Sequence, residues 1–121
     1  MNNPIQWLEI AATDLEKAKI FYESVINLNL TFVDMPGNKM YMFGEPDKMG
    51  SAGCIVQSEE NTPSAVGTII YFACEDVAVE AAKIEEADGK LIVPKTDIGE
   101  FGFFAHFIDT EGNRIGMHSQ K

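Results

Sequence analysis

The stretch "WLEIAATDLEKAKIFYESVINLNLTFV", residues 7–33, decides the fold because its pattern returns later in the chain. It begins with a short alternating run at 7–11 that is typical of a strand. A helix follows, in which apolar residues recur at three- and four-residue spacing. Thr13, with Glu16 three residues later, predicts a capping box at the start of this helix. Two asparagines then end the helix, and "LTFV" predicts the next strand.

The second half of the chain repeats this order. "TIIYFACEDVAVEAAKIEEADGKLIVP", residues 68–94, predicts a strand at 68–74, a helix that begins at Asp76 and a stop at Gly89. Each half then continues as two further strands, so the pattern predicts strand–helix–three-strand modules and an α+β fold. A single shift of 62 residues (69 − 7) superposes Trp7 on Ile69, Asp14 on Asp76, 39–43 on 101–105, Gly50 on Gly112, Cys54 on Gly116 and Val56 on His118.

The length and the position of the polar residues indicate one domain made of two modules. A chain of 121 residues is sufficient for a single, modest hydrophobic core. The polar run at 57–67 lies near the middle of the chain. We therefore predict one domain over 1–121, with module one at about 1–58 and module two at about 66–121. Neither half is large enough to bury its sheet comfortably alone.

The charge and the cysteines narrow the class of partner. The formal net charge is −10, which disfavours binding to nucleic acid and to anionic membranes. The two cysteines, Cys54 and Cys74, have no paired-motif spacing and are interpreted as free thiols. The first residues show neither a basic stretch nor a long apolar run. We expect a cytoplasmic protein.

Three stretches carry a resemblance to a known superfamily: "EIAATDLEKAKIFYESV" (9–25), "GTIIYFACEDVAVEAAKI" (67–84) and "GFFAHFIDTEGNRIGMHS" (102–119). Together they resemble the vicinal oxygen chelate superfamily, which includes glyoxalase I, bleomycin-resistance proteins and extradiol dioxygenases. The stretch at 94–114 is especially similar to uncharacterised glyoxalase-like bacterial proteins. The resemblance implies two βαβββ modules that form a curved, cup-like mixed sheet with helices outside. It also implies a homodimer.

The resemblance further implies where metal ligands would lie. In metal-dependent members they occupy the first and the last strand of each half, which correspond here to Trp7, Cys54, Ile69 and Gly116. Tryptophan, isoleucine and glycine cannot bind a divalent metal ion through their side chains. We therefore expect no metal site and no other cofactor. The fold and its cup-shaped cavity are what the resemblance still predicts.

Strand alternation selects the residues that would line the cup. Glu9 shares a face with Trp7, where its carboxylate could act as a general base or simply lie solvated at the rim. His118 shares a face with Gly116, where it could contact a ligand, move a proton or be satisfied by backbone groups. In "FFAHF" the face that carries His106 cannot be assigned. The predicted lining is Trp7, Glu9, Cys54, Val56, Ile69, Tyr71, Gly116 and His118.

Two functions follow from these residues. The first is a glyoxalase/bleomycin-resistance-like protein that binds a small molecule in the cup without a bound metal. The alternative is an enzyme: a lyase or isomerase of the glyoxalase I type, or a metal-free acid–base enzyme that uses Glu9 and His118. The loop at 94–102 could cover the cup, with Lys95 facing the ligand. The identity of the ligand, and whether the cup belongs to one chain or to two, stay open.

Overall fold

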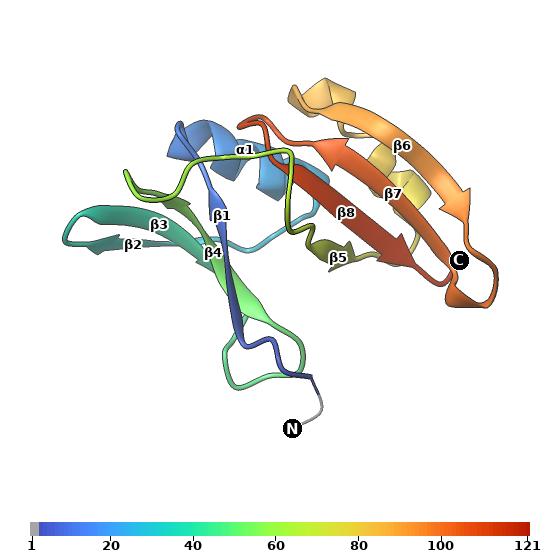
Figure 1. Ribbon diagram of the computed structural model, residues 1–121, viewed down its shortest axis with the longest axis horizontal. Helices are drawn as coiled ribbons and strands as arrows, with labels where there is room; N and C mark the ends of the chain where they lie inside the picture. The colour runs from blue at the N-terminus through green and yellow to red at the C-terminus, as the bar shows by residue number, and fades with distance from the viewer. Residues whose placement is uncertain (1–2) are drawn as a thin grey trace.

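The computed structural model describes residues 3–121, except for the side chain at position 35, and shows two βαβββ modules in sequence (Figure 1). In the first module one long helix follows the first strand, as its apolar spacing predicts. Its elements are β1 (Trp7–Ala11), α1 (Leu15–Val25), β2 (Thr31–Met35), β3 (Asn38–Phe43) and β4 (Ala52–Gln57).

The second module has the same order, but its first strand and its helix are shorter. The predicted strand at 68–74 pairs only over three residues, and the predicted helix ends after five residues. A short 3-10 helix follows at 85–87. The elements are β5 (Tyr71–Ala73), α2 (Val77–Ala81), η1 (Glu85–Ala87), β6 (Lys90–Asp97), η2 (Gly99–Phe101), β7 (Phe103–Ile108) and β8 (Arg114–Ser119).

The strands form two separate mixed sheets, ordered β1-β4-β3-β2 and β5-β8-β7-β6. In each sheet the first strand of the module pairs in parallel with the last, and the other pairs are antiparallel. The predicted α+β class and the two modules are confirmed. The predicted mixed sheet is formed by two four-stranded sheets, one from each module, which are not joined to each other by strand pairing (Figure 1).

The strand register confirms the internal repeat and corrects it at one place. Glu9 pairs with Cys54 and Tyr71 with Gly116, so the shift of 62 residues holds for the first and last strands. Cys54 also pairs with Met42, whereas Gly116 pairs with His106, which is a shift of 64 residues (106 − 42). The predicted superposition of 39–43 on 101–105 is therefore wrong by two residues. The connection between β3 and β4 is longer than the one between β7 and β8, and it absorbs the difference.

Helix α1 packs against both modules. Phe21 lies 5.5 Å, between ring centroids, from Phe107 of β7, and Tyr22 lies 5.9 Å from Phe72 of β5. Tyr41, Phe43 and Ile55 of the first sheet belong to the same buried cluster as Phe107, Ile115 and Met117 of the second. One face of each sheet is therefore covered by a shared core, and the other face of each sheet is open.

The start of α1 differs from the predicted capping box. Asp14, rather than Thr13, is the N-cap, and its carboxylate accepts a hydrogen bond from the Lys17 amide at 3.1 Å. Glu16 instead accepts a hydrogen bond from the Tyr41 hydroxyl. Glu111, in the turn between β7 and β8, accepts from the amides of Thr13 and Asp14 at 2.8 and 2.7 Å. The first helix is thus held by the second module.

A buried polar group beside Glu111 completes the junction between the modules. Asp109 is 4% exposed and accepts a hydrogen bond from the Tyr22 hydroxyl at 2.6 Å. It also accepts from the amides of Glu111 and Asn113 at 2.9 Å each. The Asn113 side chain donates to the Ala11 carbonyl at 2.8 Å. These bonds satisfy a carboxylate that would otherwise be costly to bury.

Candidate functional site

The open face of the first sheet carries half of the predicted lining. Trp7 and Glu9 lie on this face because Leu8 and Ile10, which alternate with them, pack into the core. The Trp7 indole donates to the Glu9 carboxylate over 3.3 Å, and both side chains are exposed. Two of the predicted residues are buried in a small cluster on this sheet, whose buried members are Met40, Cys54 and Val56.

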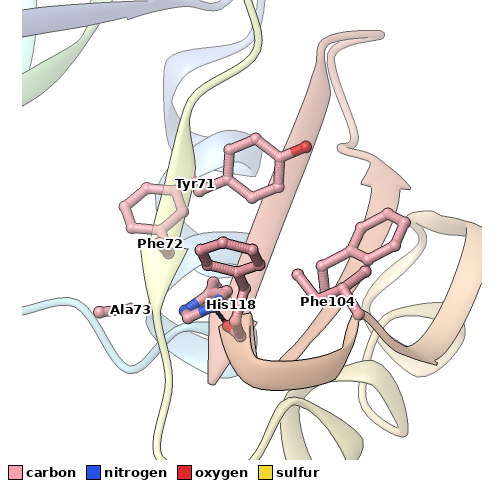
Figure 2. A pocket seen from close by; sticks show the side chains of 7 residues that line it. Tyr71, Phe72, Ala73, Phe104 and His118 are labelled. Atoms are coloured by element: carbon pink, nitrogen blue, oxygen red, sulfur yellow. Dashed lines mark hydrogen bonds between the residues drawn. The ribbon is translucent and has the colours of Figure 1, made fainter. Parts of the chain in front are cut away.

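The open face of the second sheet carries a cavity of about 620 Å³ (Figure 2). Its walls are mostly aromatic, and its polar groups come from Tyr71 and His118. Two of the predicted residues therefore line one cavity, whereas Glu9 lines a different, smaller one of about 230 Å³. Ile69 precedes β5 and is partly buried. The side chains around the larger cavity are Tyr71, Phe72, Ala73, Ile98, Phe101, Phe104 and His118.

The first part of the predicted loop at 94–102, including Lys95, belongs to β6, and only the part that follows this strand borders the cavity. Ile98 and Phe101 contribute to the cavity wall. Lys95 instead forms an ion pair with Asp76 at 2.9 Å, and this hydrogen bond lowers the pKa of the Asp76 carboxyl, assisted by the Ala78 amide. His118 donates from Nε2 to the Phe101 carbonyl, so it ties the end of the loop to β8.

Gly116 provides the seat for an aromatic ring. A Cβ atom at this position would lie 2.4 Å from the Cδ2 atom of Tyr71, much closer than atoms can pack. The Tyr71 ring therefore covers the backbone of β8 at Gly116, and Figure 2 shows it drawn over this strand. The residue type that sequence reasoning interprets as a lost ligand is required here by the packing of its neighbour.

His106, whose face the sequence does not assign, lies on this open face beside Tyr71. Its Nε2 atom is 2.6 Å from the Tyr71 hydroxyl, and its Nδ1 atom accepts a hydrogen bond from Arg114 Nε at 3.1 Å. Only 6% of the residue is exposed. Burial, and then the Arg114 charge, lower the pKa of His106 from its ordinary value. The pairing of His106 with Gly116 places His106 on the open face. The sequence repeat predicts this pairing only if the longer connection between β3 and β4 is taken into account.

The residues at the family's metal positions do not fit a divalent cation. Trp7 and Ile69 have no donor atoms for one, and the Tyr71 ring occupies the space above Gly116. Burial, with Glu9 nearby, raises the pKa of Cys54 to about 11, so its thiol remains protonated at neutral pH. Within residues 3–121 no group of three or more His, Cys, Asp or Glu side chains could hold a metal ion.

The second cysteine is no better suited to chemistry. Burial and the neighbouring Glu80 raise the pKa of Cys74 to about 12. Both cysteines are free thiols. Because the thiolate is the nucleophilic form, neither is an activated nucleophile.

None of the helices described over residues 3–121 has the length and apolar character needed to cross a membrane.

Comparison with known proteins agrees with the fold. This chain is similar in structure to the V278E variant of glyoxalase I from Zea mays, with a TM-score of 0.75 and 18% sequence identity. The similarity covers 98% of this chain and 47% of that one. A glyoxylase/bleomycin resistance protein/dioxygenase domain from Frankia matches over 100% of both chains, with a TM-score of 0.76 and 11% identity. These likenesses establish the fold alone.

Sequence relatives are more informative. Proteins of Mycobacterium bovis and Mycobacterium tuberculosis named "Putative glyoxylase CFP32" are 27% identical to this chain over 106 residues. The match covers 88% of this chain but spans only 40% of those proteins. The pattern of the Glyoxalase/Bleomycin resistance protein/Dioxygenase superfamily matches residues 4–117, nearly the whole chain. The chain therefore belongs to the glyoxalase/bleomycin resistance protein/dioxygenase superfamily.

Proposed function

We propose that this protein binds a small, flat and largely apolar molecule in the cavity on the open face of the second sheet. The observation that carries the proposal is the composition of the wall. Tyr71, Phe101 and Phe104 supply aromatic surface, and His118 supplies a polar group near them. Ligand sites in proteins combine such apolar walls with a few placed polar groups. A cavity of about 620 Å³ is of a size typical for small ligands.

We propose further that binding uses no metal ion. This follows from the donor chemistry at Trp7, Ile69 and Gly116, which offers nothing to a divalent cation. Elemental analysis of protein purified without an affinity tag tests this part. Stoichiometric zinc, nickel, iron or manganese would contradict it.

The binding proposal is tested with indane, a flat hydrocarbon, observed through the aromatic side-chain resonances of the protein. We expect the resonances of Tyr71, Phe101 and Phe104 to shift together with one dissociation constant. Phe104→Ala should weaken binding about fivefold to thirtyfold, since one aromatic wall is lost. Phe32→Ala is the matched control, because Phe32 is a 49% exposed phenylalanine on the other sheet and should leave binding unchanged. Shifts confined to the first sheet would refute the proposed site.

An acid–base enzyme that uses Glu9 and His118 is the alternative. In one chain these residues lie on different sheets and line different cavities. The alternative therefore requires that the open faces of two modules be brought together. A Glu9→Gln variant that keeps its affinity for a substrate but loses turnover would support it over simple binding.

A homodimer is the proposed state of the protein in solution. Several large side chains on or beside the open faces are exposed: Trp7 at 38%, Tyr71 at 51% and Phe101 at 67%. A second copy placed over them would remove this apolar surface from water. Sedimentation at several concentrations tests the proposal. A molar mass that stays at one chain of 13.4 kDa at all of them would contradict it.

The cytoplasm is the compartment that we propose. Its support is that Cys54 and Cys74 are free thiols, which suit a reducing environment, and that neither is paired in a disulfide.

A further inference from the structure

Three side-chain positions form a row across three neighbouring strands of the second sheet. Tyr71 of β5 pairs with Gly116 of β8, and Gly116 pairs with His106 of β7. The glycine leaves room for the tyrosine ring to lie across the middle strand. The hydroxyl thereby reaches the imidazole of the third strand, at 2.6 Å from Nε2. A side chain at the middle position would block this reach.

Arg114 settles where the imidazole proton lies. An arginine Nε atom can only donate, so His106 Nδ1, which is 3.1 Å away, must be an acceptor without a proton. A neutral imidazole then carries its proton on Nε2, the atom that faces Tyr71. Protonation of Nδ1 would place two N–H groups against each other. His106 is buried and has only these two partners on its ring nitrogens among the described side chains.

The direction of the hydroxyl bond follows. His106 Nε2–H donates, so the Tyr71 oxygen accepts, and the proton of the hydroxyl is left to point away from the imidazole. Tyr71 is 51% exposed and contributes to the cavity wall. Among the described residues, the bond to His106 is the one hydrogen bond that the Tyr71 hydroxyl makes. The oxygen of the Tyr71 hydroxyl is therefore bound by His106, and its proton is free to be donated to another group.

We propose that Tyr71 is a fixed hydrogen-bond donor that recognises a carbonyl oxygen on the flat ligand, with His106 and Arg114 as its positioning residues. The inference rests on the proposed function and specifies the class of ligand. A neutral carbonyl is favoured over a carboxylate because the protein has a net charge of −10, and because Arg114 and Lys95 are already bonded to His106 and Asp76.

The test compares two probes of nearly the same shape, 1-indanone and indane, which differ in the carbonyl group. The wild-type protein should bind 1-indanone about threefold to tenfold more tightly than indane, beyond the difference expected from their transfer out of water. Tyr71→Phe keeps the aromatic ring and should lose this preference, measured as the ratio of the two dissociation constants in the same variant. Tyr41→Phe is the matched control, since it removes a tyrosine hydroxyl bonded elsewhere, to Glu16, and should keep the preference.

A second variant keeps the Tyr71 hydroxyl and changes Gly116, the residue against which the Tyr71 ring packs. Gly116→Ala places a methyl group where the Tyr71 ring lies and should displace the ring from His106. It should therefore lose the preference for 1-indanone even though the hydroxyl is still present. A Gly116→Ala protein that retains the preference would contradict the positioning of Tyr71.

The protonation of His106 is read directly from ¹⁵N NMR of the imidazole in the ligand-free protein. We expect a protonated Nε2 and an unprotonated Nδ1, and Arg114→Gln should release this fixed state. A proton on Nδ1 overturns the inference whatever the probes do. Equal shape-corrected binding of both probes overturns it while leaving the proposed function intact. Failure of both probes to bind contradicts the proposed function, and the NMR result then still decides the orientation of the hydroxyl.

Discussion

At the scale of single residues, position 116 shows how an apparent loss can be a requirement of packing. The resemblance to the superfamily marks Gly116 as a place where a metal ligand is missing. In the structure the same glycine accommodates Tyr71, which in turn contacts His106. The two residues are complementary: a larger side chain at position 116 would need a smaller one at position 71. A metal-binding carboxylate and this tyrosine could not share the site.

His106 should make stability depend on pH. Its pKa is lowered by burial and by Arg114, so the unfolded chain takes up a proton at a higher pH than the folded one. Between the ordinary value of 6.5 and the lowered value, the free energy of unfolding therefore falls as the pH falls. Above this window the stabilising contribution is complete, and below it no further loss occurs.

Urea denaturation of the wild type and of His106→Gln, from pH 8 to pH 5, measures this effect. The stability difference between the two proteins should shrink as the pH decreases through about 6.5. Phe104→Leu, next to His106 but without a titrating group, should differ from the wild type by an amount that does not change with pH. A pH-independent difference for His106→Gln would contradict the prediction.

At the scale of elements, helix α1 depends on a residue far from it in the sequence. Glu111 satisfies two backbone amides at the start of the helix and also accepts from the Thr13 hydroxyl at 3.1 Å. A carboxylate is stabilising at this end of the helix dipole. The corresponding place in the first module is Met49, which is 93% exposed and makes no such contact with α2. The repeat is therefore one of strands and helices but not of their capping.

Replacement of Glu111 should destabilise the protein without changing the cavity. Glu111→Ala leaves the first amides of α1 without their acceptor and should lower the free energy of unfolding by about 1–2 kcal/mol. Glu111→Gln keeps an acceptor oxygen and should cost about half as much. The exposed residue Glu60 provides the control, because Glu60→Ala should change stability by no more than about 0.5 kcal/mol. Equal stability of the two alanine variants would show that Glu111 is not a cap.

Element positions are the part of the fold that periodicity predicts best. Helix α1 and the order of helices and strands along the chain follow from apolar spacing and from the turn glycines, and both are found as predicted. The contact of Glu111 with the start of α1 and the register of β7 were missed for physical reasons. Glu111 is 97 residues from Asp14, and a local capping rule cannot detect an acceptor at that separation. The register of β7 depends on the length of a loop, which the turn glycines do not determine.

At the scale of the whole molecule, the two modules share one core and one buried polar junction. Tyr22 of α1 and Asp109 of the second module meet at 2.6 Å in this junction. Burial and the Asp109 carboxylate raise the pKa of Tyr22 well above its ordinary value, so the hydroxyl always donates. Spacing along the sequence does not predict the junction, because Tyr22 lies on the apolar face of α1 and Asp109 lies in the turn after β7.

Tyr22→Phe should reveal how strongly the modules are coupled. It removes the donor to a buried carboxylate and should lower the free energy of unfolding by about 1.5–3 kcal/mol. We expect unfolding to stay a single transition, since Phe21 and Tyr22 pack in the core that both sheets share. Fluorescence of Trp7 reports on module one, and circular dichroism reports on the whole chain. Separate midpoints from these two probes in the wild type would contradict a common core.

At the candidate site, the sequence predicts which residues share a face of a strand, but not how the two sheets are arranged. Tyr71, Gly116 and His118 are placed on one face by simple alternation, and they lie on one open face in the structure. Glu9 and His118 could not be assigned to one cavity or to two, because alternation says nothing about how separate sheets are arranged. The role of Gly116 depends on the rotamer of a neighbouring ring, which no spacing rule determines.

The contact of Glu111 with the start of α1 also has a consequence for synthesis of the protein. A ribosome releases the residues of α1 long before the turn at 109–113, so the helix emerges with two amides that have no acceptor yet. The acceptor for these amides is the carboxylate of Glu111, which is synthesised 97 residues after Asp14. Until then α1 and the apolar faces of the first sheet lack their partners. Chains stalled before this turn are therefore expected to be targets for proteases and chaperones, and chains that have passed it are not.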